Sequence, residues 1–166
     1  TALVLCFILG PWLIRKMQTL QIVQQIRSDG PGSHFSKQGT PTMGGILIVF
    51  SVVVSTLLWA KLNVDYVWMV IIVTVGFGLI GFVDDYRKLS RRDSRGLPGK
   101  TRLLLEFVIA FTVSCLLFLK PDFNSTVTIP FFKTIMPDLQ WFYVIFSTFI
   151  IVGAANAVNL TDGLDG

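Results

Sequence analysis

The feature that most constrains this chain is a run of 18 residues without a charged side chain between Asp65 and Asp84. A helix rises about 1.5 Å per residue and the apolar core of a bilayer is about 30 Å thick, so about 20 apolar residues can cross it. Four further apolar runs follow the same pattern. Together they predict transmembrane helices at about 1–14, 44–60, 67–83, 103–119 and 139–158. The uninterrupted apolar character excludes the alternating strand of a membrane barrel.

The composition supports this interpretation. Apolar residues make up 52% of the chain and charged residues 14%, against about 25% charged in an ordinary globular domain. These values exclude a disordered chain, a disulfide scaffold and a typical cytosolic enzyme. Cys6 and Cys115 both lie inside apolar runs, where a free cysteine behaves as a small hydrophobe. We therefore expect an all-α polytopic membrane protein, with residues 1–166 forming a single transmembrane domain.

Basic residues predict the orientation of the chain. Eleven of the fourteen Lys and Arg residues lie in segments 15–43 and 84–102. The positive-inside rule places both segments in the cytoplasm, and the order of the spans then places 159–166 there as well. The excess of basic residues is in this setting a topology signal, not a nucleic-acid footprint.

Two adjacent carboxylates, Asp84 and Asp85, follow the third run. Acidic residues within or beside a membrane span are energetically costly and are usually functional. Neighbouring residues on a helix point about 100° apart, so one carboxylate could bind a metal while the other orients or activates a reacting group. The alternative is a solvated helix end whose acids pair with Arg87 and Lys88.

A dense polar segment, 156–166, follows the fifth run and contains two amides, one hydroxyl, two carboxylates and two glycines. Amides and carboxylates give directional hydrogen bonds to a base or a sugar, and glycine lets backbone N–H groups approach a ligand. A helix C-cap followed by an ordinary turn is the alternative interpretation.

The segment 33–45 joins the first two spans and carries a lysine and two threonines before a glycine pair. Lys37 could meet a phosphate as a point charge. Thr42 could donate a hydrogen bond to the same ligand, or it could cap the second helix.

Some polar and small residues lie within the apolar runs. Glu106 interrupts the fourth run; we expect it to pair with Arg102 one turn earlier, and a buried catalytic acid is the alternative. Gly76, Gly78 and Gly81 should permit close packing between helices. Residues 126–129 could form a short hairpin on the outer side.

Taken together, three predicted cytoplasmic segments supply carboxylates, a lysine, hydroxyls and glycine turns at one membrane face. Carboxylates beside phosphate groups suit Mg²⁺, which takes few protein ligands and completes its shell with substrate oxygens. The pattern predicts phosphate chemistry between a soluble anionic donor and a membrane-embedded acceptor.

The segments 33–45, 81–88 and 156–166 resemble the phospho-N-acetylmuramoyl-pentapeptide transferases, a branch of the polyprenyl-phosphate N-acetylhexosamine-1-phosphate transferases. The resemblance implies a Mg²⁺-dependent enzyme of the bacterial inner membrane with a cytoplasmic active face. It would transfer phospho-N-acetylmuramoyl-pentapeptide from its UDP donor to undecaprenyl phosphate, forming lipid I and UMP. Such a reaction serves peptidoglycan synthesis, and through it cell wall biogenesis, cell shape and cell division.

The same resemblance assigns roles to particular residues. Asp84 and Asp85 are implied to be catalytic and to contribute to the metal site, whose main ligand is expected beyond residue 166. Membrane lipids and a second copy in a homodimer are implied partners, and nucleic acid is not. Residues implied to bind the substrate are Lys37, Thr42, Asn159, Asp162, Gly163, Leu164 and Asp165.

The chain departs from the family pattern in its length. The resemblance implies about ten spans of about 20 residues each, whereas five are predicted here, so we expect an N-terminal fragment that is inactive alone. A sister transferase that uses UDP-N-acetylglucosamine is the nearest alternative. A membrane transporter or scaffold is the alternative from another class. The key acids fall on one predicted side, whereas acids lining an ion path would lie near the midplane or on both sides.

Overall fold

The regular structure of the chain is helical, as the apolar runs predict. The computed structural model describes residues 1–19, 44–91, 96–129, 131, 134 and 136–163. The all-α fold class is confirmed: outside the helices, the described residues contain one isolated β-bridge and no strand. The helices are α1 (Ala2–Thr19), α2 (Gly45–Trp59), α3 (Asp65–Arg91), α4 (Gly99–Phe118) and α5 (Phe142–Gly163).

Three of these helices are long and apolar enough to cross a membrane, over Asp65–Ser90, Gly99–Phe118 and Phe142–Leu160. The apolar helix α2 is shorter, with 15 residues. These lengths agree with a polytopic membrane protein. Spans formed by α1 and α2 stay a prediction.

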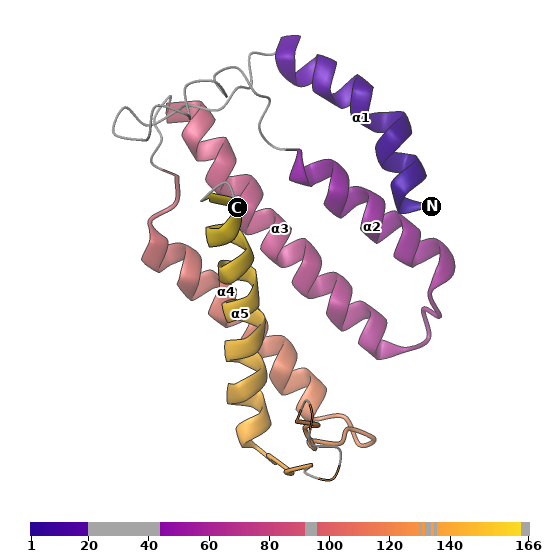
Figure 1. The fold of residues 1–166 in the computed structure, drawn as a ribbon, viewed down its shortest axis with the longest axis vertical. Helices are drawn as coiled ribbons and strands as arrows, with labels where there is room; N and C mark the ends of the chain where they lie inside the picture. The colour runs from indigo at the N-terminus through magenta and orange to yellow at the C-terminus, as the bar shows by residue number, and fades with distance from the viewer. Residues whose placement is uncertain (20–43, 92–95, 130, 132–133, 135, 164–166) are drawn as a thin grey trace. The chain divides into compact units, whose positions relative to one another are not determined.

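The chain divides into two compact units, and the first comprises Thr1–Arg102. Within it, α2 lies between α1 and α3 (Figure 1) and contacts both. The indole N–H of Trp59, at the end of α2, donates a hydrogen bond of 2.8 Å to the Thr1 hydroxyl. On α3, a Cβ added at Gly78 would lie 3.1 Å from a methyl group of Val49 on α2, so the expected close packing is confirmed at Gly78. Gly81 faces open space, and there the expectation is wrong.

The helix α3 extends beyond its apolar run to Arg91. Hydropathy alone ends the predicted span at residue 83, but the residues that follow are compatible with a helix and include acid–base pairs at helical spacing. Asp84 and Asp85 therefore lie on the helix itself.

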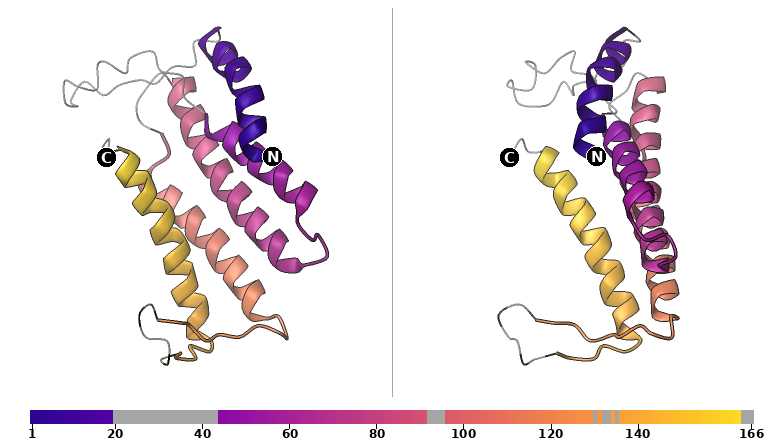
Figure 2. Two further views of the ribbon diagram at one scale, coloured as in Figure 1. Left: turned by 45° about the vertical axis from the view of Figure 1, so that its right-hand side comes forward. Right: turned by 90° about the vertical axis from the view of Figure 1, so that its right-hand side faces the viewer.

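The second unit, Leu103–Gly166, contains most of α4 together with α5, which run antiparallel (Figure 2). Their buried residues recur at helical spacing and form one stripe on each helix. The Ser147 hydroxyl on α5 donates a hydrogen bond of 2.9 Å to the Ser114 hydroxyl on α4. Phe107 and Phe149 meet edge to face with ring centroids 5.3 Å apart. The stripes comprise Glu106, Ala110, Val113 and Ser114 on α4, and Val144, Thr148 and Val152 on α5.

The connection between α4 and α5 is closed by backbone pairing. Thr126 and Asp138 form an antiparallel bridge. Beside it, the N–H of Val127 donates to the carbonyl of Pro137 at 3.0 Å. The segment 126–129 therefore contributes to an antiparallel pairing, and its partner residues lie close to α5.

Asp138 fixes the end of this connection. Its carboxylate accepts hydrogen bonds from the Ser125 hydroxyl and, at 3.1 Å, from the backbone N–H of Gln140. These two bonds, the Ser125 bond first, hold the pKa of Asp138 below its usual value because they favour the charged carboxylate.

Candidate functional site

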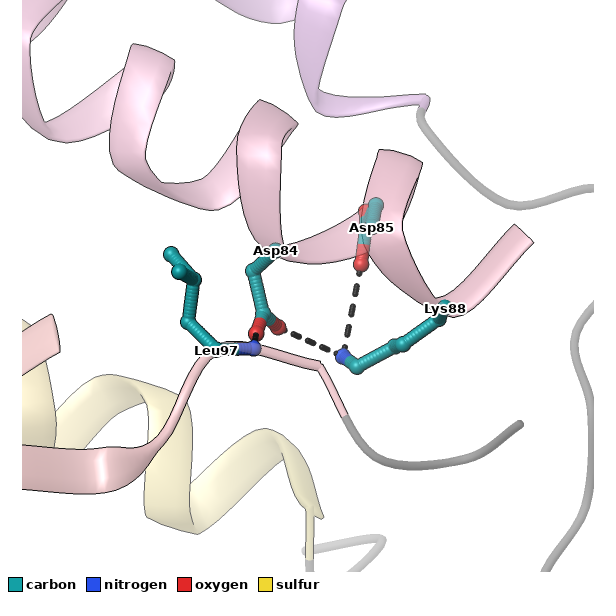
Figure 3. A network of polar contacts seen from close by, with 4 residues as sticks. All are labelled: Asp84, Asp85, Lys88 and Leu97. Atoms are coloured by element: carbon teal, nitrogen blue, oxygen red, sulfur yellow. Dashed lines mark hydrogen bonds and ion pairs between the residues drawn. The ribbon is translucent and has the colours of Figure 1, made fainter. Parts of the chain in front are cut away.

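A compact charged cluster lies near the C-terminal end of α3 (Figure 3). Residues three and four apart on a helix are neighbours on its surface, so one lysine can reach two adjacent acids. The ammonium of Lys88 lies 2.6 Å from Oδ2 of Asp84 and 3.4 Å from Oδ1 of Asp85. The structure therefore brings the two predicted catalytic carboxylates to a shared cation.

The two carboxylates are held differently. The side chain of Asp84 is 12% exposed, whereas that of Asp85 is 33% exposed. The backbone N–H of Leu97, in the segment leading to α4, donates a hydrogen bond of 2.6 Å to Oδ1 of Asp84. Each oxygen of Asp84 thus has its own donor, and hydrogen bonds to a charged acceptor are stronger than neutral ones. Asp84 is the more firmly oriented member of the pair.

The pair suits a hard divalent cation. Carboxylate oxygens are preferred ligands of Mg²⁺, which usually takes one or two from the protein and fills its remaining positions with water and substrate phosphates. Within the described ranges, no group of three or more His, Cys, Asp or Glu side chains gathers. Asp84 and Asp85 could supply two carboxylate ligands to such an ion.

The remaining predicted site residues fall at the end of the second unit or outside the described ranges. Asn159 is exposed on α5. This helix continues to Gly163, beyond the predicted limit at residue 158, so Asp162 and Gly163 belong to its last turn. Those outside the described residues are Lys37, Thr42, Leu164 and Asp165.

Some contacts were not anticipated from the sequence. Neither Leu97 nor the adjacent Gly96 was singled out, because a backbone N–H carries no residue-type signal and the contact joins residues 13 apart. Glu106 is 3% exposed and accepts a hydrogen bond from the side-chain amide of Asn156, 50 residues away on α5. The sequence signal for this contact was that two apolar runs each contain a polar residue, Glu106 in the fourth run and Asn156 in the fifth.

Comparison with known proteins gives two family matches. Residues 67–166 match the model of glycosyl transferase family 4, and residues 37–49 match signature 1 of the phospho-N-acetylmuramoyl-pentapeptide transferases. The chain belongs to glycosyl transferase family 4. The family 4 match includes Asp84, Asp85 and Asn159, and the shorter signature includes Lys37 and Thr42.

Individual relatives of this family 4 chain carry the same name as the signature. The chain is 69% identical over 166 residues to the phospho-N-acetylmuramoyl-pentapeptide-transferase of Syntrophus aciditrophicus. This match covers 100% of the chain and 46% of the relative. The protein of that name in Pelobacter propionicus is 54% identical over 100% of the chain. The one in Desulfotalea psychrophila is 53% identical over 99% of the chain. Each match covers 46% of the relative. The resemblance inferred from the motifs is confirmed. The chain spans about half the length of these relatives.

Proposed function

We propose that the full-length protein containing this chain transfers phospho-N-acetylmuramoyl-pentapeptide from its UDP donor to undecaprenyl phosphate, forming lipid I and UMP. The observation that carries the proposal is the pair Asp84 and Asp85, held on one lysine at the end of a helix of membrane-crossing length. The match to signature 1 and the names of the relatives support the choice of donor.

The transfer is a substitution at phosphorus. An oxygen of the lipid phosphate forms a bond to the phosphorus attached to the muramoyl sugar, and the bond from that phosphorus to the UMP oxygen breaks, with its electron pair leaving on UMP. A phosphate monoester has a second pKa of about 6, so the acceptor is mostly dianionic at pH 7. A carboxylate beside it then acts by orienting the acceptor or by taking its remaining proton. Both are roles that Asp84 or Asp85 could fill.

Mg²⁺ is the cofactor that fits this proposal. Asp84 and Asp85 would hold it together with the substrate phosphates and a further ligand beyond residue 166. When bound, the ion offsets the negative charge that develops on the leaving UMP. The chain's own contribution is the fixed orientation of the Asp84 carboxylate and the positive charge of Lys88.

The other predicted residues are proposed to bind the donor. Lys37 and Thr42 would approach the nucleotide phosphates, and the end of α5 would meet the uridine. The site would face the cytoplasm at the bacterial inner membrane, and the protein would act as a homodimer. The uridine-binding set is Asn159, Asp162, Gly163, Leu164 and Asp165.

Substitution of the carboxylates tests their role. In the full-length protein in detergent, Asp84→Asn and Asp85→Asn should each lower Mg²⁺-dependent UMP release by at least about 100-fold, a loss typical of groups that act on the reacting atoms. Asp65→Asn, at the opposite end of α3, is the matched control and should keep its activity. Full activity in either Asn variant at the pair would contradict the proposal.

A further inference from the structure

The short segment before α4 contacts the Asp84 carboxylate directly. Residues 96–98 are here called the strap. Its Leu97 N–H donates to Oδ1 of Asp84 at 2.6 Å, while Oδ2 is paired with Lys88 at 2.6 Å (Figure 3). One oxygen is therefore held by the strap and the other by α3 itself.

The strap is anchored beyond the contact. The carbonyl of Pro98 accepts a hydrogen bond of 3.0 Å from the N–H of Arg102, in the first turn of α4. Proline also restricts the backbone of the residue before it, here Leu97. The donor that meets Asp84 is thus fixed between a proline and a helix, and its N–H is presented in a defined direction.

Gly96 makes the close approach possible. A Cβ added at this position would lie 2.7 Å from the carboxylate carbon of Asp84 and 2.8 Å from Cε of Lys88. Real Cβ atoms essentially never approach heavy atoms within 3.0 Å. The backbone of Gly96 is outside the left-handed region, so glycine is needed here for space and not for its φ angle.

We infer that Gly96 and the N–H of Leu97 are positioning residues, which hold the Asp84 carboxylate in the orientation required for phospho-sugar transfer. The inference rests on the proposed function. An alanine at position 96 would displace the ends of two side chains, Asp84 and Lys88, without requiring the helices to move. A substitution in the strap can therefore change the orientation of the Asp84 carboxylate without replacing Asp84 itself.

The experiment compares two glycines in the full-length protein. Gly96→Ala should lower kcat for UMP release by about 100-fold, as expected for a shift of about 1 Å at a reacting group. The KM for the UDP donor should change by less than about threefold. Gly99→Ala is the control, because a Cβ there meets nothing within 4 Å and its φ angle is equally ordinary. This variant should retain wild-type kcat.

A stability measurement tests the contact independently of activity. Gly96→Ala should lower the thermal unfolding midpoint in the wild-type background, since it breaks the hydrogen bond to Asp84. In an Asp84→Ala background the same substitution should leave the midpoint unchanged or slightly raised, because the carboxylate is gone and alanine restricts the unfolded chain.

The outcomes separate the inference from the function on which it rests. Equal midpoint losses in both backgrounds would overturn the contact, and an unchanged kcat in Gly96→Ala would overturn the positioning role. Failure of the wild-type protein to release UMP would instead contradict the proposed function. The midpoint comparison would then still decide whether the strap holds Asp84.

Discussion

Lys88 is the residue on which the charge balance of the site depends. It contacts both carboxylates of the pair, and its side chain is 39% exposed. Ion pairs at this exposure contribute less than about 1 kcal/mol to stability, so its main effect should be on the reaction. Lys88→Gln should lower kcat/KM for UMP release at least about tenfold and change the free energy of unfolding by less than about 1 kcal/mol.

Kinetics and unfolding of this variant should be measured on one preparation. Lys61→Gln, in the loop between α2 and α3, serves as the control for loss of a positive charge. If Lys88→Gln kept its full kcat/KM, Lys88 would have no part in the transfer.

Asp138 predicts a pH dependence outside the membrane spans. Its pKa is lowered in the folded chain, so it contributes stability that is fully present above its ordinary value of about 3.9 and is lost as the pH falls through the folded pKa. The protection factor for hydrogen exchange at the N–H of Val127, beside the Thr126–Asp138 bridge, should therefore fall below about pH 4.

The hydrogen bond from the Ser125 hydroxyl is the main cause of the lowered Asp138 pKa, so a variant without this hydroxyl provides the comparison. Ser125→Ala should raise the Asp138 pKa toward its ordinary value and move the loss of protection to higher pH. Superimposable exchange profiles for the two proteins would show that the Ser125 hydroxyl does not stabilise the charged carboxylate.

At the scale of single residues, the sequence predicted the carboxylate pair but not the contacts that hold it. Asp84 and Asp85 were recognised because charged groups beside an apolar run are costly. Lys88 was named only in the alternative interpretation, as a partner of the two acids, and the structure shows that pairing. Leu97 acts through its backbone, and Gly96 through the absence of a side chain. Neither property can be read from a single sequence, because each gains its meaning from what lies next to it in space.

Among the elements, α2 and α3 depend on a small residue at their contact. Gly78→Leu places a side chain where Val49 already lies and should destabilise the protein by about 1–3 kcal/mol. Gly81→Leu, one turn further along α3, faces open space and should be close to neutral. The free energy of unfolding of both variants can be measured in detergent. Equal losses of stability would mean that α2 and α3 do not approach at Gly78.

The helices α4 and α5 are joined by a buried polar contact. Asn156→Leu removes the amide that donates to Glu106 and should cost about 1–2 kcal/mol, the upper range for a hydrogen bond between membrane helices. Asn159→Leu, exposed on the same helix, should be nearly neutral. A denaturant titration compares them, and a larger loss for Asn159→Leu would contradict the importance of the Glu106 contact.

Hydropathy located the elements but not their ends. A helix lies in each of the five predicted runs, but α3 continues to Arg91 and α5 to Gly163. An apolar run marks where lipid contact is favourable, whereas a helix ends where its backbone loses hydrogen-bond partners. Polar residues such as Asp84 and Asn159 are compatible with helix geometry, and for that reason the helices continue past the predicted spans.

At the scale of the whole molecule, the described chain is one part of a proposed enzyme. It spans about half the length of its relatives, and the proposed Mg²⁺ site needs a further ligand beyond residue 166. The 166-residue chain should therefore release no UMP by itself. Assay of the purified chain beside the full-length protein tests this, and turnover by the chain alone would contradict it.

The central claim concerns the donor and the reaction, and UMP release by the full-length protein tests it most directly. The assay uses Mg²⁺, detergent and undecaprenyl phosphate, with UDP-N-acetylmuramoyl-pentapeptide and UDP-N-acetylglucosamine offered separately. We predict UMP release and a lipid-linked diphosphate product from the muramoyl donor only. Release from UDP-N-acetylglucosamine alone would contradict the substrate, and no release from either donor would contradict the transferase itself.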